Sequence, residues 1–165
     1  MERPARSVRT ATLADLDAIA QVENTCFPAA EAATEKDIKN RLDYYANHFW
    51  LLFDGDTLVS FVDGFVTDEK DLTDEMYENA ALHNENGAWQ MIFGVNTLPA
   101  YRRQGCAAQL LERAIHDARA QGRKGLVLTC KDALIHYYEK FGFVNEGISA
   151  SVHGNVVWYQ MRLTF

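Results

Sequence analysis

The strongest constraint on the fold is a long apolar segment that gives way to a basic turn and then to an amphipathic stretch. Residues 89–95 are mostly apolar and predict a strand, residues 96–105 are polar and basic, and apolar residues over 106–120 recur at helical spacing. Gly105, Ala107 and Ala108 place small residues at the first turn of this helix, where backbone N–H groups have no partner within the helix. A strand–turn–helix unit of this kind predicts an α/β protein with an anion-binding helix N-terminus.

The turn is open to two interpretations. Arg102 and Arg103 add positive charge beside the N–H groups, which favours a pyrophosphate, but a basic loop before an ordinary helix start would have the same composition. No Gly-Lys-Ser/Thr follows the turn, and the G-x-G-x-x-G spacing is missing. A P-loop nucleotide hydrolase and a nicotinamide enzyme are therefore disfavoured.

Strands and helices are predicted to alternate along the rest of the chain. Thr12-x-x-Asp15 and Thr34-x-x-Asp37 resemble capping boxes with Asp in the acidic place, so a helix should follow each of them. Strands are predicted over 7–10, 49–53, 58–66, 126–129, 143–148 and 156–163, helices over 13–25, after Thr34 and over 132–141, and a loop with a short helix over 68–79. This order predicts one α/β domain over residues 1–165, built on a mixed, mostly antiparallel sheet of roughly six to seven strands flanked by helices.

Charge and hydropathy limit the partners. The formal net charge of -7 argues against general affinity for nucleic acid, which needs a clustered basic surface. An acidic surface would suit a cationic substrate, although solubility is the simpler reason for it. The chain begins without the apolar core of a signal peptide, and no apolar run approaches the ~18 residues of a membrane span. We therefore expect a cytoplasmic monomer or homodimer with no membrane or nucleic-acid partner.

The cysteines and histidines predict neither a disulfide framework nor a metal site. Three cysteines, Cys26, Cys106 and Cys130, lie far apart and form no C-x-x-C pair, so free thiols are expected. Five histidines without close spacing give no metal-binding pattern. Cys106 at a helix start could be a nucleophile, but a small residue beside the phosphates is its simpler role.

Several segments resemble the GNAT superfamily of acetyltransferases. The turn Arg102-Arg103-Gln104-Gly105-Cys106-Ala107 is similar to the Q/R-x-x-G-x-G/A motif of that superfamily, with alanine in the last small position. Residues 130–143, CKDALIHYYEKFGF, are very similar to a segment of the arylalkylamine N-acetyltransferases, and residues 68–83 and 23–33 also resemble that family and its bacterial and fungal relatives. The resemblance implies a GNAT fold, in which a central pair of strands splays apart.

The resemblance also implies acetyl-CoA as co-substrate and no metal. The family's turn binds the pyrophosphate, which here assigns that role to Arg102, Arg103, Gln104, Gly105, Cys106, Ala107 and Ala108. The strand before the turn pairs with pantetheine through backbone groups that match Phe93, Gly94 and Val95, with an N–H near Phe93 directed at the thioester oxygen. A bulge at Gly94 would turn that N–H out of the ladder, but Gly94 could instead only let another segment approach. Asp132 lies near the family's cofactor path, and capping of the following helix is its other expected role.

Tyr138 matches the family's general acid in the segment Tyr-Glu-Lys-Phe-Gly-Phe. A phenol has an unperturbed pKa of ~10, so it is protonated at neutral pH and can donate to a leaving thiolate. A half-buried helix aromatic is the structural alternative for this residue. The match predicts direct acetyl transfer in a ternary complex, with Tyr138 as the acid.

The general base is where the chain departs from the family. The animal enzymes carry a His-x-His pair on the strand before the turn, and the matching residues here are Trp89 and Met91, which cannot accept a proton. Glu31, His83 and Glu23 are candidate replacements. A solvated loop charge, a surface residue and an exposed helix residue are the respective structural alternatives. A weakly basic amine could also react without a protein base and lose its proton to water.

The substrate expected from the resemblance is a small primary amine, either an arylalkylamine or a polyamine. Trp89, Trp158 and Tyr159 could line an aromatic pocket, or they could be ordinary core residues. The missing histidine pair leaves an acyl-CoA-binding sensor or interaction module as an alternative function, and a protein or peptide acetyltransferase is another.

Overall fold

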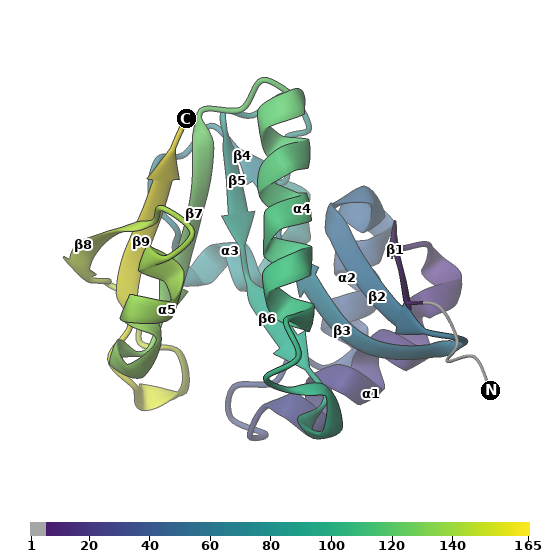
Figure 1. Cartoon of the computed structure of the whole chain (residues 1–165). Coiled ribbons are helices and arrows are strands. Elements are labelled where there is room, and N and C mark those ends of the chain that lie inside the picture. Colours follow the sequence, from purple (N-terminus) through teal and green to yellow (C-terminus); the bar gives the residue numbers. More distant parts are fainter. Residues whose placement is uncertain (1–5) are drawn as a thin grey trace. The chain divides into compact units, whose positions relative to one another are not determined.

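The computed structural model describes residues 6–165, in which strands and helices alternate along the chain (Figure 1). The strands are β1 (Arg6–Thr10), β2 (Phe49–Asp54), β3 (Thr57–Asp63), β4 (Val66–Thr67), β5 (Trp89–Ile92), β6 (Gly94–Thr97), β7 (Gly125–Cys130), β8 (Val144–Ile148) and β9 (Tyr159–Thr164). The helices are α1 (Leu16–Cys26), α2 (Glu35–Tyr45), α3 (Asp74–Glu78), α4 (Cys106–Ala120) and α5 (Ile135–Glu139). No helix in this part of the chain combines the length and the apolar character that crossing a membrane requires.

The described chain divides into two compact units. The first unit contains the residues up to Asp63 together with Gly94–Ala114, and the second contains Gly64–Phe93 together with Ile115–Phe165. In the first unit, β1, β2, β3 and β6 form an antiparallel sheet in that order. In the second unit the order is β4-β5-β7-β9-β8, with β5 and β7 parallel and the other neighbours antiparallel. The predicted α/β class and mostly antiparallel pairing are confirmed.

Two of the predicted strands divide between these sheets. The strand expected over 58–66 is β3 followed by β4, and the strand expected over 89–95 is β5 followed by β6. Since β3 pairs with β6 while β4 pairs with β5, the strands form two hydrogen-bonded sheets instead of the one that was expected. Apolar residues lie on both sides of each break, so hydrophobic periodicity does not reveal the breaks.

Gly64 is required at the first of these breaks. An added Cβ atom there would lie 1.7 Å from the Met91 carbonyl oxygen and 2.8 Å from the Ile92 Cα atom. The Met91 N–H donates to the Phe65 carbonyl oxygen at 2.8 Å, which holds the two segments together. Because the atoms in the way belong to the backbone of β5, only glycine fits at this position.

The two predicted capping boxes start the first two helical segments. Thr34 Oγ1 accepts the Asp37 N–H at 3.1 Å, and the Thr34 N–H donates to Asp37 Oδ2 at 3.1 Å. At the first box the Thr12 N–H donates to Asp15 Oδ2 at 2.8 Å, and a 3-10 turn precedes α1. Both helices predicted from these boxes are confirmed, because each box satisfies backbone donors that the helix itself cannot pair.

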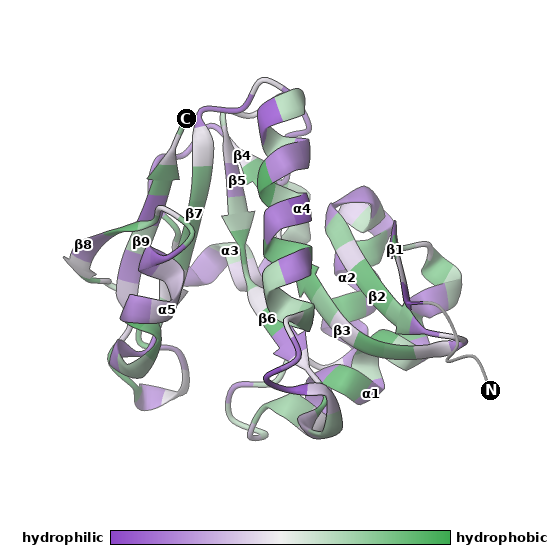
Figure 2. Cartoon of the chain, viewed as in Figure 1, coloured by the Kyte–Doolittle hydropathy of each residue, from purple (hydrophilic) through white to green (hydrophobic). Residues whose placement is uncertain are grey.

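Each unit buries its own apolar side chains. In the first unit Ile19, Ile38 and Phe61 are at most 1% exposed, and most of β2 is hydrophobic in Figure 2. In the second unit Leu126 and Met161 are fully buried in β7 and β9. Burial of each such side chain stabilises the fold by roughly 1.5–3 kcal/mol.

Candidate active site

The predicted phosphate turn lies in the first unit, between β6 and α4. Its residues Arg102, Arg103, Gln104 and Gly105 are exposed. Arg103 has a φ of 61° and Gly105 a φ of 79°, so two residues of the turn adopt the left-handed conformation. Turns that contain such residues can direct neighbouring N–H groups toward one anion.

Side-chain contacts within the first unit hold this turn. Tyr101 Oη donates to Asp54 Oδ2 at 2.9 Å, and Arg102 Nε donates to the Thr97 carbonyl oxygen at 3.2 Å. Cys106 is 2% exposed, and its Sγ lies 3.7 Å from the Tyr101 carbonyl oxygen. This burial agrees with the simpler role expected for Cys106, a small residue under the turn.

The start of α4 presents backbone donors beside the turn. The Gln109 N–H bonds the Gly105 carbonyl oxygen at 3.0 Å, so the N–H groups from Gly105 to Ala108 precede the first α-helical bond and have no partner within the helix. Ala107 and Ala108 are half-buried and carry only methyl groups, which lets an anion approach the backbone. The helix dipole and the arginines of the turn add positive potential at the same place.

A β-bulge lies in the segment before the turn. Phe93 belongs to neither of the ladders on its two sides. Pairing advances from Asp63 opposite Gly94 to Val66 opposite Gln90, which is three residues along one segment and four along the other. The extra residue falls within 90–94, where the resemblance expects an N–H outside the ladder.

Four buried polar side chains form a cluster in the first unit. The cluster consists of Glu23 on α1, Arg41 on α2, Asp63 at the end of β3 and Asn96 on β6, each at most 8% exposed. Arg41 Nη1 lies 3.3 Å from Asp63 Oδ2, and Asn96 Nδ2 donates to Glu23 Oε1 at 3.3 Å. A Cβ atom added to Gly94 would lie 2.8 Å from Asp63 Oδ1 and 3.1 Å from Asn96 Nδ2. Gly94 therefore leaves space for this cluster beside β6.

Asp63 is a group of this cluster whose pKa is shifted toward neutral pH. Burial raises the pKa of Asp63 to about 7, with Arg41 lowering it and Glu23 raising it. Asp63 Oδ1 and Asn96 Oδ1 are both buried, and neither accepts a hydrogen bond from any residue between 6 and 165. Near neutral pH Asp63 can therefore exist in both the protonated and the ionised form.

Replacement of Asp63 by asparagine is expected to change how stability depends on pH. The pKa of Asp63 is about 7 in the folded protein, against ~4 for an unfolded aspartate. Between these values the folded state binds more protons, so the wild type loses stability relative to Asp63→Asn as pH rises. Urea unfolding at a series of pH values should show a variant-minus-wild-type free energy that increases by roughly 4 kcal/mol at most and levels off above pH about 7. A difference that stays constant with pH would contradict this assignment.

Glu23 and Glu31 are less exposed than the surface positions that were the alternatives to a role as base. Glu23 is 6% exposed, so it is not an exposed helix residue. Its Oε1 accepts the Asn96 amide and its Oε2 accepts the Ala33 N–H at 2.9 Å. Glu31 is half-buried in the turn after Pro28, where its N–H donates to the Pro28 carbonyl oxygen at 2.9 Å. The Glu23 carboxyl is thus held by two hydrogen bonds, and Oε2 of Glu31 is buried.

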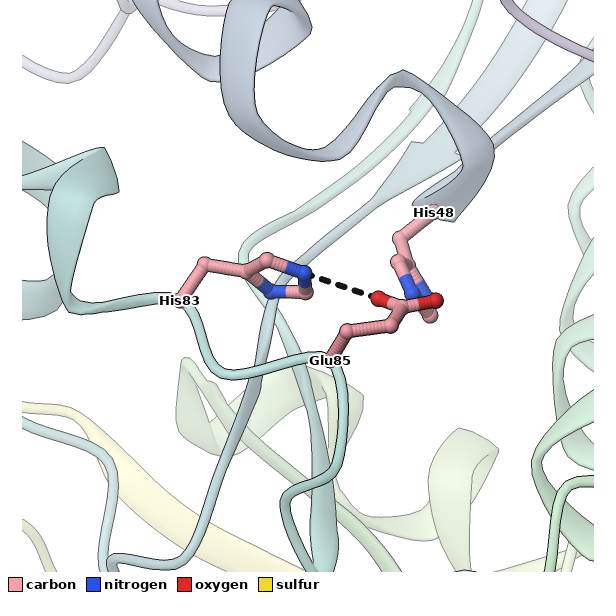
Figure 3. A group of neighbouring side chains, drawn as sticks. All are labelled: His48, His83 and Glu85. Atoms are coloured by element: carbon pink, nitrogen blue, oxygen red, sulfur yellow. Dashed lines mark hydrogen bonds and ion pairs between the residues drawn. The ribbon is translucent and has the colours of Figure 1, made fainter.

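His83 is held by two hydrogen bonds within the second unit. The Val66 N–H donates to Nδ1 at 3.0 Å, and Nε2 lies 2.8 Å from Glu85 Oε2, the contact drawn as a dashed line in Figure 3. Since Nδ1 accepts a hydrogen bond, the neutral ring carries its proton on Nε2 and donates it to Glu85. Both ring nitrogens are engaged, so His83 in this arrangement anchors β4 and offers no lone pair to an amine.

Tyr138 lies on α5 in the second unit and is 5% exposed. Its ring contacts Tyr137 and Phe143 edge-to-face, with centroids 5.1 and 6.1 Å away. Burial raises the pKa of Tyr138 well above the usual phenol value, and Cys130 and Tyr137 act in the same direction. The phenol is therefore protonated at neutral pH, as a general acid must be.

Asp132 is exposed, whereas the two residues that match the histidine pair are buried. Asp132 is exposed and begins the 3-10 turn Asp132–Leu134, whose N-cap is Lys131 without a side-chain cap, so the expected capping role is wrong. Trp89 is 8% exposed, and the guanidinium carbon of Arg162 lies 4.6 Å from the centre of its ring. Met91 is fully buried. The positions of the histidine pair are thus occupied by core side chains.

An aromatic row runs through the second unit. It consists of Phe65, Phe93, Tyr77, His153 and Trp158, with successive ring centroids 5.0, 4.7, 5.7 and 6.2 Å apart. The Tyr77 phenol lies 3.2 Å from Thr129 Oγ1. All of these rings except Phe65 are half-buried, so they can contact an aromatic ligand.

Sequence reasoning named Glu23 but missed the other three residues of the buried cluster and most of the aromatic row. Asp63 carried a signal, because it is the one charged residue in the otherwise apolar stretch 58–66. Arg41 carried another, since it lies one residue before Leu42 on the apolar side of α2 and is buried there. Charged residues are seldom buried without a partner, so such positions indicate a polar cluster.

Comparisons with known proteins give the family and the fold. A family model described as the acetyltransferase (GNAT) family matches residues 16–143. Serotonin N-acetyltransferase from Mesocricetus auratus is 32% identical over 111 residues, which are 67% of this chain and 52% of that protein. The chain therefore spans about half the length of the curated relatives it matches.

Solved structures share the fold over nearly the whole chain. The loading GNATL domain of CurA from Lyngbya majuscula has a TM-score of 0.85 at 16% identity and covers 97% of this chain and 98% of its own. The GphF GNAT-like decarboxylase in complex with isobutyryl-CoA has a TM-score of 0.82 at 21% identity and covers 96% and 98%. At these identities the likeness concerns the fold alone.

Proposed function

Because the chain belongs to the acetyltransferase (GNAT) family, we propose that it transfers an acetyl group from acetyl-CoA to a small primary amine. The proposed catalytic domain comprises residues 1–165 and uses direct transfer in a ternary complex. The observation that carries the proposal is the exposed turn with two left-handed residues, followed by N–H groups at the start of α4 that have no partner within the helix. The same turn carries the family's motif.

The turn and the strand before it are the proposed cofactor site. The residues assigned to it are Phe93, Gly94, Val95, Arg102, Arg103, Gln104, Gly105, Cys106, Ala107, Ala108 and Asp132. The N–H groups at the start of α4 would bind the pyrophosphate, and the arginines would neutralise its charge. The bulge within 90–94 supports a backbone N–H that faces the thioester oxygen, and one such donor contributes ~3 kcal/mol to lowering the barrier.

The proposed chemistry needs no covalent enzyme intermediate. The amine nitrogen attacks the thioester carbonyl carbon, the carbon–sulfur bond breaks, and the coenzyme leaves as a thiolate. Tyr138 is the proposed proton donor to that thiolate, and its buried, protonated phenol supports the role. Acetyl-CoA is proposed as the acetyl donor because the chain belongs to an acetyltransferase family. GphF, which has the same fold, binds isobutyryl-CoA, another acyl-CoA.

An arylalkylamine is the amine that the described residues support best. The half-buried rings of Tyr77, Phe93, His153 and Trp158 would contact the aromatic end of such a substrate. The serotonin N-acetyltransferase relatives are named after serotonin, which is an aromatic amine. A polyamine has no ring to stack, although the net charge of -7 would suit its cations.

Release of free thiol from acetyl-CoA tests the proposal. The purified protein is incubated with phenylethylamine, with spermidine and with a short peptide, each beside an amine-free control. We expect thiol release that depends on the amine and is fastest with phenylethylamine. Equal release with and without every amine would contradict the proposal and favour an acyl-CoA-binding module, and a preference for the peptide would favour a peptide acetyltransferase.

Replacement of Gly105 by valine should weaken coenzyme A binding. Gly105 has a φ of 79° and no atom within 4 Å of an added Cβ, so a branched side chain would occupy the space where the pyrophosphate is proposed to lie. We expect Kd to rise by about 10-fold or more in calorimetry, a loss of ~1.4 kcal/mol or more. Gly122→Val is the matched control, because Gly122 has a φ of 78° and equally open surroundings at the other end of α4. Equal affinities for both variants would count against the turn.

A further inference from the structure

The proposed reaction needs a group that removes a proton from the amine, and the family's histidine pair is missing. We propose that Asp63 is this group and that its Oδ1 atom receives the proton. The inference rests on the proposed function and deepens it by naming a residue that neither sequence motif nor family resemblance assigns. Asp63 and the side chains around it all belong to the first unit.

Asp63 has an oxygen that the fold leaves unused. The residue is 1% exposed, and Oδ2 faces Arg41 Nη1 at 3.3 Å. Oδ1 is buried and receives no hydrogen bond from the described chain. An unpaired buried acceptor costs roughly 1–3 kcal/mol, so a fold that keeps one at this place indicates a use for it.

This oxygen lies against the strand segment proposed to hold the thioester. Asp63 and Gly94 are direct partners in the ladder of β3 and β6. Oδ1 is the atom nearest to an added Cβ on Gly94, at 2.8 Å. Asn96 Oδ1 is a second buried acceptor without a partner in residues 6–165. An ammonium group has three protons to donate, and Asp63 Oδ1 is an acceptor for one of them.

Glu23 is less suited to the role, although it lies in the same cluster. Its two oxygens already accept hydrogen bonds from Asn96 Nδ2 and from the Ala33 N–H. Each of these bonds occupies a lone pair that a base would need. We assign Glu23 to positioning Asn96 and to supplying negative charge beside Asp63.

The charges around Asp63 suit a group that accepts and then releases a proton. Arg41 and Tyr45 face it from α2, Glu23 from α1 and Asn96 from β6. Burial raises the pKa of Asp63 to about 7 against the opposing effect of Arg41. A base works best when its pKa lies near the pH of the reaction.

The proposed step balances in protons and electrons. An N–H bond of the ammonium breaks and an Oδ1–H bond forms, which leaves a lone pair on nitrogen. That pair forms the bond to the thioester carbon while the carbon–sulfur bond breaks, and the thiolate takes a proton from the Tyr138 phenol. The acylated nitrogen loses its second proton to solvent, and Tyr138 regains a proton from solvent, so the products are the neutral amide and the free thiol. Asp63 then releases its proton to solvent and returns to the ionised form.

The pH dependence of kcat tests the inference. At saturating acetyl-CoA and phenylethylamine, wild-type kcat should fall as pH drops through about 7, because Asp63 becomes protonated. In Asp63→Asn this fall of kcat at acidic pH, the acidic limb of the pH profile, should be absent. The variant should also have a kcat lower by ~10²-fold or more, with a KM for acetyl-CoA within about twofold of the wild-type value. Asp63→Glu, which restores a carboxyl, should again show a kcat that falls as the pH drops.

Two controls separate a base from a structural residue. Asp15→Asn removes another carboxyl of the first unit, one that is 9% exposed and paired with Arg9, and it should leave the pH profile unchanged. An arylamine that is already neutral at pH ~7 does not have to lose a proton before it attacks, so Asp63→Asn should lower its rate far less than that of phenylethylamine. A structural fault would lower both rates equally.

The outcomes distinguish this inference from the proposed function. Suppose that the wild type acetylates phenylethylamine, but that kcat of Asp63→Asn still falls at acidic pH or that its rates with phenylethylamine and the arylamine drop equally. Asp63 is then not the base, while the acetyltransferase proposal stands. If Asp63→Asn does not fold, a wild-type profile without a limb near pH about 7 has the same meaning. If wild type releases no thiol with any amine, the proposed function itself fails.

Discussion

Tyr138→Phe is expected to lower kcat by ~10²–10³-fold while the affinity for coenzyme A changes by less than about twofold. The substitution removes one hydroxyl from a ring that is 5% exposed and packed between Tyr137 and Phe143. Packing is therefore retained, and what is lost is the proton that the departing thiolate would receive. Steady-state thiol release combined with calorimetry for coenzyme A measures the two effects separately.

Tyr137→Phe is the matched control for this prediction. Tyr137 lies next to Tyr138 on the same short helix, with the ring centroids 5.1 Å apart. Loss of its hydroxyl should change kcat by less than about threefold. If both variants kept wild-type turnover, the thiolate would obtain its proton from elsewhere and the acid role of Tyr138 would be abandoned. If both lost activity equally, the helix itself would be the important feature.

Gly64→Ala is expected to have the largest effect on folding. The new methyl group would lie 1.7 Å from the Met91 carbonyl oxygen, 2.6 Å from its carbon and 2.8 Å from the Ile92 Cα atom. These atoms belong to the backbone of β5, which pairs with β7 and cannot move without breaking that ladder. We expect a loss of more than ~3 kcal/mol in the free energy of unfolding, or no folded protein at all.

Gly122→Ala provides the comparison for Gly64. Gly122 has a φ of 78° but no atom within 4 Å of an added Cβ, so the cost there is backbone strain alone, ~1–2 kcal/mol. Urea denaturation of both variants should give a much larger loss for Gly64→Ala. If both losses were about equal, the close approach of Gly64 to β5 would not exist in solution.

Much of the fold follows from local sequence signals. The boxes at Thr12 and Thr34 start helical segments, and the small residues after Gly105 begin α4. These predictions succeed because caps and helical periodicity depend on residues within one or two turns. The division of the strands between two sheets cannot be predicted in this way, since the pairing partners of a strand lie in distant segments of the sequence. Gly64 is the exception, a glycine inside an apolar strand, which indicates close backbone approach.

Some residues of the candidate site can also be predicted from the sequence, and others cannot. The turn at 102–108 and Tyr138 are visible in the sequence because each lies within a contiguous motif. The cluster of Glu23, Arg41, Asp63 and Asn96 is not, because its members come from four separate elements. Trp89 and Met91 show why motif transfer has limits, since the strand is present although its positions that match the histidine pair hold buried core residues.

Every catalytic role proposed for this protein depends on binding of coenzyme A. Calorimetric titration of the wild-type protein with coenzyme A, with Gly105→Val and Gly122→Val measured in parallel, shows whether the turn holds the cofactor. We expect saturable binding at one site per chain, weakened by the first variant and retained by the second. If wild type shows no heat of binding and no occupancy at millimolar coenzyme A, the turn before α4 does not hold a pyrophosphate, and the proposed acetyl transfer is wrong.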